Sequence, residues 1–401
     1  MTATIARVDH LHAGAGWRNY HYLKLTTSDG VIGWAEYDEA LRSPGTTSVI
    51  DQLAPHVIGR PVDDTERLTN RLSTLTRPAH GSAVSMAIGA IENAALDAKA
   101  RTLGVPCYSL LGGKVRDQIR VYWSHCATWR ISLPQWYGNE INHIDQVVEL
   151  GAEVRQSQFT ALKTNIFDYD ANGVPRGWFP GFGQPDDPSL NVERRVLRNI
   201  RRHLEALREG AGPDVDLMMD INFNARTEGL LRIVRELDDF DMFWLEIDHD
   251  SADGLARVRE ASRSAISGGE TLFGIKQFLP HLQAGSLDVA IIDTIWNGTL
   301  QSMKMAAAAA AFEVNVAPHN YYGHLCTFMS AHFAAAVPNL RIMETDIDRI
   351  PWDDELVTHS PEYKGGHLVL ADRPGWGTEP DEEAIAAHPP VEAGDLISMR
   401  R

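Results

Sequence analysis

Six apolar segments in the second half of the chain each end on a residue that can carry charge. These end residues are Asp220, Glu246, Glu270, Asp293, His319 and Glu344, and successive ones lie 23 to 26 residues apart. Amphipathic stretches such as TEGLLRIVRELDDF separate the segments, so strand and helix patterns alternate. Strands that read as fully buried, with a helix between each pair, predict a parallel sheet.

Two earlier segments extend this alternation to eight strands. One is the apolar run near residues 119–124, and the other ends at Lys163. Eight consecutive βα units close into a (β/α)8-type barrel, which makes the chain α/β, and we expect the barrel to span residues 119–349. The carboxyl ends of its strands open on one face, where the active sites of such barrels lie. The chargeable residues are therefore expected at the rim of one shared pocket.

The first 118 residues follow a different pattern. Residues 20–37 hold two β-rich runs around an Asp-Gly turn, which predicts a β-hairpin. Small and apolar residues recur at helical spacing over residues 82–103, and Gly104 follows as a stop signal. We expect a separate N-terminal α+β unit over residues 1–118, with the segment 350–401 packing back on it.

The composition narrows the choice of partners. The formal net charge is −17, which argues against binding to nucleic acid or to an anionic membrane surface. The three cysteines are widely spaced and indicate neither a disulfide framework nor a CxxC metal motif. The N-terminus lacks an apolar signal region and no segment reaches transmembrane length, so a cytoplasmic location is expected.

Two irregular segments interrupt the alternation of strands and helices. Residues 129–143 follow the first strand, while residues 167–190 follow the second and are rich in Gly, Pro and Asp. Long irregular loops in a compact domain are usually functional. We expect residues 167–190 and the N-terminal loop around Trp17 to close over the pocket.

Three carboxylates fall at the ends of three consecutive strands, at Asp220, Glu246 and Glu270. Like charges that converge in a pocket repel one another unless a cation lies among them. Oxygen ligands with open coordination positions suit Mg²⁺, or Mn²⁺ in its place. Any one of these acids alone is more simply a solvated loop end, but three in register on neighbouring strands indicate a metal site.

His319 and Asp293 end the seventh and sixth strands, so we expect them to be neighbours. A carboxylate on one imidazole nitrogen fixes the tautomer and raises the basicity of the other nitrogen, as a general base requires. The alternative is a purely structural hydrogen bond. Glu344 could be protonated and donate to developing negative charge, or be a surface ion-pair partner. Lys163 could hold an anionic substrate group, or be solvated like most lysines.

Further polar and aromatic residues near the strand ends are candidates for binding the substrate. For each of them, packing or loop polarity is the competing interpretation. They are His125, Asn165, Asn222, Asn224, His249, Trp296 and His324. Trp17, Arg18 and Tyr20 belong to an N-terminal loop that could cap the same pocket.

This constellation resembles the enolase superfamily, in particular its mandelate racemase subgroup. The resemblance covers nearly the whole chain, and residues 92–113, which read ENAALDAKARTLGVPCYSLLGG, are similar to the family's helix and loop before the barrel. It implies an N-terminal capping domain and a homo-oligomer. The family's three metal ligands match Asp220, Glu246 and Glu270. Its catalytic dyad matches Asp293 and His319, and its strand-8 electrophile matches Glu344.

One position departs from the subgroup's usual pattern. The second strand commonly carries Lys-x-Lys, whose second lysine is a base, and here it reads Lys163-Thr164-Asn165. Asparagine takes no proton at neutral pH, so His319 is left as the evident base. A Lys-x-Asn strand is similar to that of the galactonate-type sugar acid dehydratases, although their histidine after the third-strand ligand is Asn222 here.

The resemblance therefore implies a Mg²⁺-dependent dehydratase, a hydro-lyase, acting on a small-molecule sugar acid (an aldonate or aldarate). His319 would remove the proton alpha to the carboxylate, the metal and Lys163 would stabilise the enediolate, and loss of the β-hydroxyl would give a 2-keto-3-deoxy sugar acid. Within the family, the alternatives are a cycloisomerase or an epimerase of a sugar acid or its lactone. From other classes, the alternatives are a catalytically silent, metal-dependent sugar-acid-binding protein and a barrel enzyme for phosphorylated substrates, although no glycine-rich phosphate loop follows the seventh or eighth strand.

Overall fold

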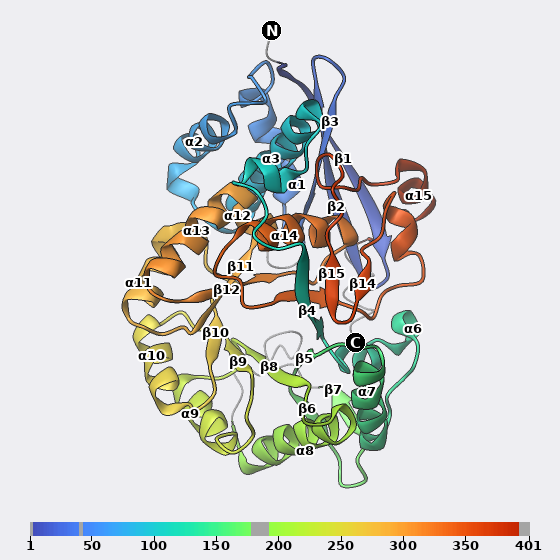
Figure 1. The fold of residues 1–401 in the computed structure, drawn as a ribbon, viewed down its shortest axis with the longest axis vertical. Coiled ribbons are helices and arrows are strands. Elements are labelled where there is room, and N and C mark those ends of the chain that lie inside the picture. Colours follow the sequence, from blue (N-terminus) through green and yellow to red (C-terminus); the bar gives the residue numbers. More distant parts are fainter. Residues whose placement is uncertain (1–2, 40–42, 178–191, 393–401) are drawn as a thin grey trace.

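The computed structural model describes residues 3–39, 43–177 and 192–392 of the chain. Figure 1 shows an N-terminal unit of strands and helices at the top and a ring of strands with outer helices below it. The chain after the ring, drawn in red, returns to run beside the N-terminal unit.

Eight parallel strands form the barrel, and the first seven pair in chain order. They are β4 (Gln118–Ser124), β5 (Ala161–Thr164), β8 (Asp216–Asn222), β9 (Trp244–Ile247), β10 (Ile266–Gly268), β11 (Val289–Asp293), β12 (Asn315–His319) and β13 (Met343–Asp346). β13 pairs in parallel with β4, and Val316 of β12 is hydrogen-bonded to Asn339 and Arg341 just before β13. The last strand thus joins the first, and the predicted barrel is confirmed.

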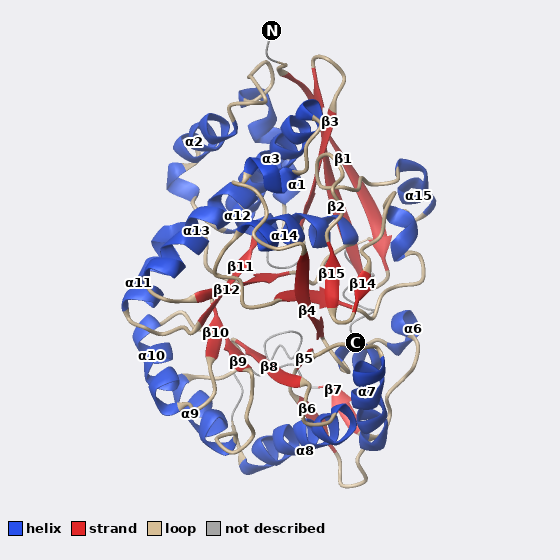
Figure 2. Ribbon diagram, in the orientation of Figure 1, coloured by secondary structure: helices blue, strands red, loops and turns tan. Residues whose placement is uncertain are grey.

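Helices surround these strands, as Figure 2 shows. They are α7 (Ile144–Gln156), α8 (Arg194–Ala211), α9 (Thr227–Glu236), α10 (Ala252–Ala261), α11 (Gly274–Gln283), α13 (Thr299–Ala311) and α14 (His324–Ala336). α8 illustrates why they form: Ile200, Leu204 and Leu207 are buried, while arginine and glutamate fill most of the remaining positions. This helical periodicity packs an apolar stripe against the strands.

Alternation along the strands sets apart the residues that face the barrel interior. One buried cluster contains no helix residue and so lies within the ring; it includes Tyr122, Ala161, Met218, Trp244, Ile291, Ala317 and Ile342. A residue two positions further along a strand points to the same side. By that rule, seven polar residues face the interior at its carboxyl end: Ser124, Lys163, Asp220, Glu246, Asp293, His319 and Glu344. These polar side chains therefore face the barrel interior rather than the helices.

The N-terminal unit is an antiparallel sheet covered by helices. The sheet contains β1 (Ile5–Ala15), β2 (Arg18–Thr27) and β3 (Ile32–Tyr37), in that order. The helical elements are α1 (Thr46–Leu53), η1 (Ala54–His56), α2 (Thr65–Leu75), η2 (Arg77–Ala79), α3 (Ser82–Leu103) and α4 (Cys107–Leu110). The predicted hairpin is confirmed as β2 and β3, whereas β1, with its many polar residues, was not predicted. α3 lies so close to β3 that a Cβ on Gly33 would be 2.1 Å from the carbonyl oxygen of Ala94.

The buried carboxylate of Glu92 ties α3 to the barrel. It accepts hydrogen bonds from the backbone N–H of Leu300 at 2.8 Å and from Thr69 Oγ1 at 3.1 Å. Leu300 lies in the first turn of α13, where a negative charge is favourable. Burial nevertheless raises the pKa of Glu92 to about 7, against the opposing effect of these hydrogen bonds.

We expect Glu92→Gln to weaken the pH dependence of stability between about pH 5 and about pH 8. The pKa in the folded protein lies above the ordinary value of 4.5, so the contribution of Glu92 to stability is present in acid and is lost as the pH rises through 7. The shift corresponds to about 3 kcal/mol, or several degrees in Tm. Thermal melts would show a smaller fall in Tm for Glu92→Gln than for wild type or for the exposed control Glu209→Gln. Equal pH dependence in all three proteins would contradict this assignment.

The chain beyond the barrel contacts the N-terminal unit. Its elements are η3 (Asp353–Leu356), β14 (Tyr363–Lys364), β15 (His367–Val369) and α15 (Glu382–Ala387). Trp376 donates from its indole N–H to the carbonyl of Trp34 at 2.9 Å, and from its backbone N–H to Asp97 at 2.8 Å. Gly14 of β1 donates to the carbonyl of His388 at 2.9 Å. These bonds anchor the described part of the tail on β1, β3 and α3.

The two segments expected to be irregular contain short ordered elements. These elements are α5 (Thr128–Ser132), α6 (Pro134–Tyr137), β6 (Phe167–Tyr169) and β7 (Pro175–Gly177). Elements this short give little periodic signal in the sequence. The remainder of the expected cover, residues 178–190, lies outside the described residues. Across the described ranges, no helix is both long and apolar enough to cross a membrane.

Candidate active site

A buried ammonium group lies among carboxylates at the carboxyl end of the barrel. Lys163 Nζ is 2.9 Å from Glu246, 3.0 Å from Glu344 and 3.6 Å from Asp220. Burial alone would lower the pKa of Lys163, but the carboxylates, Glu246 foremost, raise it well above its usual range. Lys163 is therefore a fixed positive charge.

The three carboxylates predicted to bind metal lie on neighbouring strands. Asp220 and Glu246 stand opposite each other on β8 and β9, and Glu270 follows β10 by two residues. All three are buried. Burial first, and then the neighbouring carboxylates, raise the pKa of Glu246 well above its usual range, against the attraction of Lys163. Burial and Glu270 likewise raise the pKa of Asp220.

Within the described residues, no group of three histidine, cysteine or carboxylate side chains is gathered as a metal site. The donor chemistry nevertheless fits a hard divalent cation, because Asp220, Glu246 and Glu270 are buried, mutually repulsive and offer only oxygen ligands. Hydrogen bonds from neighbouring groups also hold two of these carboxylates in place. Trp244 donates from its indole N–H to Glu246 at 3.1 Å, and the backbone N–H of Asn222 donates to Asp220 at 2.8 Å.

His319 and Asp293 form the predicted pair at the ends of β12 and β11. They stand opposite each other in the strand register, with 2.6 Å between His319 Nδ1 and Asp293 Oδ2. Asp293 also caps α12 (Thr294–Asn297), since its Oδ1 accepts from the backbone N–H groups of Ile295 and Trp296. A carboxylate only accepts, so Nδ1 of the imidazole donates and Nε2 faces Glu270 at 3.2 Å.

The surroundings hold a proton on His319. Burial alone would lower the pKa of His319, but Glu270, Asp293 and Glu344 raise it to about 10. Glu270 makes the largest raising contribution, and it is also one of the carboxylates suited to a cation. A cation beside Glu270 offsets its attraction for the imidazolium, which favours the neutral imidazole that a base requires.

The contacts of Glu344 favour the ion-pair alternative over the protonated form. Its neighbours donate to its carboxylate: Ser124 Oγ, the backbone N–H of Asn320 at 2.8 Å, and Lys163. Burial acts to raise the pKa of Glu344, but attraction by Lys163 and His319 outweighs burial and holds the pKa below its usual range. Glu344 is thus an ionised partner of Lys163 rather than an acid.

Three of the predicted substrate-binding residues are buried beside these groups. Asn165 Oδ1 accepts from Thr128 Oγ1 at 2.7 Å. Asn222 has a positive φ of 53° where β8 ends, next to Asp220. Trp296 packs edge-on against His319, with ring centroids 5.5 Å apart. Their observed contacts position the site.

Two histidines singled out by the sequence have ordinary structural bonds. His249 Nε2 lies 2.9 Å from Thr227 Oγ1 at the start of α9, and its Nδ1 accepts from the backbone N–H of Ser251. His324 Nε2 lies 2.7 Å from Asp354 in η3. For both, the competing interpretation of loop polarity is the better one.

Trp17 and Arg18 reach from the N-terminal unit to the barrel. Arg18 donates to the backbone carbonyl of Tyr321, and its Nη2 lies 3.8 Å from Asp346 Oδ2. Trp17 packs against Trp129, with ring centroids 5.1 Å apart. Both side chains are buried, so their described contacts dock the N-terminal unit on the barrel.

Asp346 is buried on β13 two positions after Glu344 and was not predicted from the sequence. Its Oδ1 lies 2.9 Å from Nδ1 of His125, the residue that follows β4. Alternation along the strand is the signal that could have found it, because residues i and i+2 point to the same side. His125 itself has a φ of +49°, which is uncommon for a residue with a side chain.

Two family models together cover most of the chain. One, described as Enolase C-terminal domain-like, matches residues 146–384, and the other, the Mandelate racemase / muconate lactonizing enzyme N-terminal domain, matches residues 13–112. The chain belongs to the mandelate racemase / muconate lactonizing enzyme family. The resemblance drawn from the strand ends is therefore confirmed.

Relatives within this family are similar to the chain over most of its length. A D-galactonate dehydratase family member of Streptomyces bingchenggensis is 31% identical, over 100% of this chain and 96% of its own. The D-gluconate dehydratase of Thermoproteus tenax is 28% identical, over 92% and 70%. A Burkholderia xenovorans crystal structure is 59% identical, with a TM-score of 0.97 over 99% of both chains. That protein is provisionally named an L-alanine-DL-glutamate epimerase and is bound to magnesium and fumarate.

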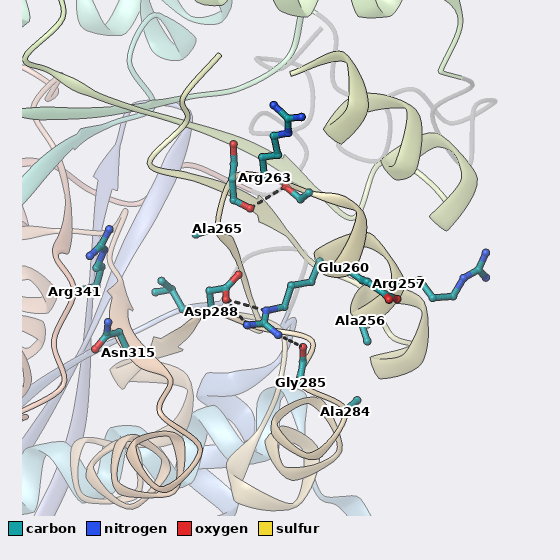
Figure 3. Close-up of a pocket in the computed structure, with 14 residues that line it drawn as sticks. Ala256, Arg257, Glu260, Arg263, Ala265, Ala284, Gly285, Asp288, Asn315 and Arg341 are labelled. Carbon is teal, nitrogen blue, oxygen red and sulfur yellow. Dashed lines mark hydrogen bonds and ion pairs between the residues drawn. The ribbon is translucent and has the colours of Figure 1, made fainter. Parts of the chain in front are cut away.

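In the present protein, a cavity of about 700 Å³ lies at the amino-terminal end of the barrel, opposite the candidate active site (Figure 3). It is lined by Ala265, Val289 and Asn315, which lie at the amino ends of β10, β11 and β12. Arg257 and Arg263 at its edge are exposed and point away from each other. None of the predicted site residues lines this cavity, and the amino-terminal face of such barrels serves stability.

Proposed function

We propose that the protein is a Mg²⁺-dependent dehydratase that converts a sugar acid, an aldonate or aldarate, into a 2-keto-3-deoxy sugar acid. The main support is one arrangement: a fixed ammonium group, three buried carboxylates and an imidazole–carboxylate pair share the carboxyl end of one barrel. These are the groups that proton removal next to a carboxylate needs. The dehydratase names of two relatives agree with this reaction class.

The difficult step is removal of a weakly acidic proton from the carbon next to the carboxylate. His319 accepts this proton at Nε2, while Asp293 holds the ring through Nδ1. Lys163 exchanges part of its pairing with the protein's carboxylates for the carboxylate of the substrate. When bound, Mg²⁺ supplies Lewis-acid charge at that carboxylate. The residues that would hold it are Asp220, Glu246 and Glu270.

Asn165 favours elimination over epimerisation by two opposed bases. Its amide accepts no proton at neutral pH, and its Oδ1 is engaged by Thr128 at 2.7 Å. The carbanionic intermediate then has no group at that position that can return a proton to it. With a β-hydroxyl present, loss of water becomes the productive exit.

Epimerisation is the second candidate, because the 59% identical Burkholderia protein carries an epimerase name. An epimerase would share the proton removal by His319 but retain every hydroxyl of its substrate. The fumarate in that structure is a dicarboxylate, so aldarates are as important to test as aldonates.

A substrate screen in D₂O separates these activities. The protein with Mg²⁺ is incubated with stereodefined aldonates and aldarates and with L-alanyl-L-glutamate. Dehydration yields a 2-keto acid, whereas epimerisation yields deuterium at Cα and no 2-keto acid. A 2-keto acid from any sugar acid supports the proposal, and deuterated dipeptide alone would replace it with the epimerase. A complete lack of exchange would favour the catalytically silent binding protein.

A further inference from the structure

We infer that His125 is the acid that protonates the departing β-hydroxyl, and that Asp346 is its positioning residue. This role rests on the proposed dehydratase function. It assigns the second step of that reaction, the loss of water, to a second imidazole–carboxylate pair. The first pair, His319 with Asp293, joins β12 and β11. The second joins the ends of β4 and β13, across the seam where the barrel closes.

One ring nitrogen of His125 is fully engaged. Nδ1 lies 2.9 Å from Asp346 Oδ1 and 3.0 Å from Ser124 Oγ. The hydroxyl hydrogen of Ser124 is donated to Glu344, so toward the imidazole its oxygen accepts. The carboxylate of Asp346 accepts as well. Nδ1 therefore carries a hydrogen, and these two acceptors fix the orientation of the ring.

The other ring nitrogen, Nε2, makes no hydrogen bond to the part of the chain that the structure describes. The side chain is 15% exposed, and Nε2 is not among the buried side-chain atoms that lack a partner, so it is open to a ligand. Trp129 stacks on the imidazole with ring centroids 4.5 Å apart, which holds its plane. The left-handed backbone at His125 is strained, and such strain persists where the surroundings impose it, often at functional sites.

His125 also lies close to the groups proposed to handle the substrate. Ser124 Oγ, 3.0 Å from His125 Nδ1, donates to Glu344, which in turn lies 3.0 Å from Lys163. The ring of Tyr321 contacts both imidazoles, with centroids 5.7 Å from His125 and 5.2 Å from His319. Two supported imidazoles thus approach the same region from different strands.

The proposed elimination of water needs no oxidant, reductant or co-substrate. His319 takes the proton from Cα, and the electron pair of that bond passes into the substrate carboxylate. When the pair returns to form the Cα–Cβ double bond, the Cβ–O bond breaks and its electrons leave with the oxygen. His125, in its imidazolium form, gives this oxygen the proton on Nε2 and becomes a neutral imidazole that keeps its hydrogen on Nδ1, so water departs. The enol tautomerises to the 2-keto acid, His319 releases its proton, and solvent reprotonates His125.

Separate groups suit the two proton transfers. If His319 performed both, the proton and the hydroxyl would have to leave from the same face of the substrate. Nε2 of His319 is also next to Glu270, at 3.2 Å. A second imidazole removes this constraint and permits elimination from opposite faces.

The test compares two leaving groups in His125→Asn. The substrates are the sugar acid that the screen shows to react fastest and its 3-deoxy-3-fluoro analogue, because fluoride leaves without a proton. We expect water loss to fall by at least about 100-fold, while fluoride loss and deuterium exchange at Cα stay near wild-type rates. His249→Asn is the matched control, since its imidazole bonds to Thr227. Asp346→Asn should lower water loss less and shift its pH–rate profile, which a merely structural role would not do.

Two results would overturn the inference while leaving the dehydratase intact. One is wild-type water loss by His125→Asn, and the other is an equal loss of both leaving groups and of exchange. If the variant does not fold, the wild type decides: kcat/KM for the hydroxy substrate should fall at alkaline pH more than for the fluoro substrate, and identical profiles would refute the role. A wild type that dehydrates no sugar acid removes the proposed function, and this inference with it.

Discussion

His319→Asn is expected to abolish both formation of the 2-keto acid and exchange of solvent deuterium into Cα. Asparagine is polar and of similar shape but has no basic nitrogen, so proton removal loses its acceptor. General-base catalysis contributes at least about 100-fold, and we expect kcat/KM to fall by at least that factor. Proton NMR in D₂O follows exchange and product in one sample.

Asp293→Asn tests the contribution of the carboxylate that pairs with His319. The amide oxygen can still cap α12 through the N–H groups of Ile295 and Trp296. The fold is therefore retained, while the charge that orients and activates His319 is lost. The rate should fall by less than in His319→Asn. Near-wild-type exchange in His319→Asn would instead mean that the base lies elsewhere, with Lys163 the next candidate and two-base epimerisation the leading mechanism.

Removal of divalent metal should abolish turnover, and Mg²⁺ should restore it. In the proposed site, Asp220, Glu246 and Glu270 carry more negative charge than Lys163 offsets. A cation that binds only the folded protein stabilises it by about 2.7 kcal/mol when its concentration is 100 times Kd. Mg²⁺ should therefore raise the Tm of the wild type, a readout independent of activity. Glu246→Gln should lose both the turnover and this rise in Tm.

The exposed residue Glu260 provides the matched control. Glu260→Gln removes one carboxylate from the opposite end of the barrel and should leave the effect of Mg²⁺ unchanged. An equal rise in Tm for wild type and Glu246→Gln would place the ion elsewhere. Full turnover by metal-free Glu246→Gln would rule out the metal-dependent mechanism.

The barrel and the positions of its polar rim could be predicted because both follow from periodicity. A strand alternates its side chains, and parallel neighbours bring equivalent positions to one level. Asp220 with Glu246, and Asp293 with His319, are opposed pairs in the strand register. Residues spaced 23 to 26 apart in the chain therefore lie side by side in the structure.

The remainder depends on contacts that no local pattern encodes. Arg18 is more than 300 residues away in the chain from Tyr321, to which it donates. Whether Glu344 is ionised depends on Lys163, which comes from a different strand. The pairing of His125 with Asp346 depends on closure between the first and last barrel strands. His125 could be predicted as a candidate from its place after a strand, but its partner Asp346 could not.

The closure between β4 and β13 also determines when chemistry can begin during synthesis. Lys163 and His319 are synthesised before Glu344 and Asp346, which are on the last barrel strand. Until that strand pairs with β4, Lys163 lacks one carboxylate and His125 lacks the group that orients it. A nascent chain therefore carries no working pocket. Premature termination before residue 346 should yield an inert fragment rather than a slow enzyme.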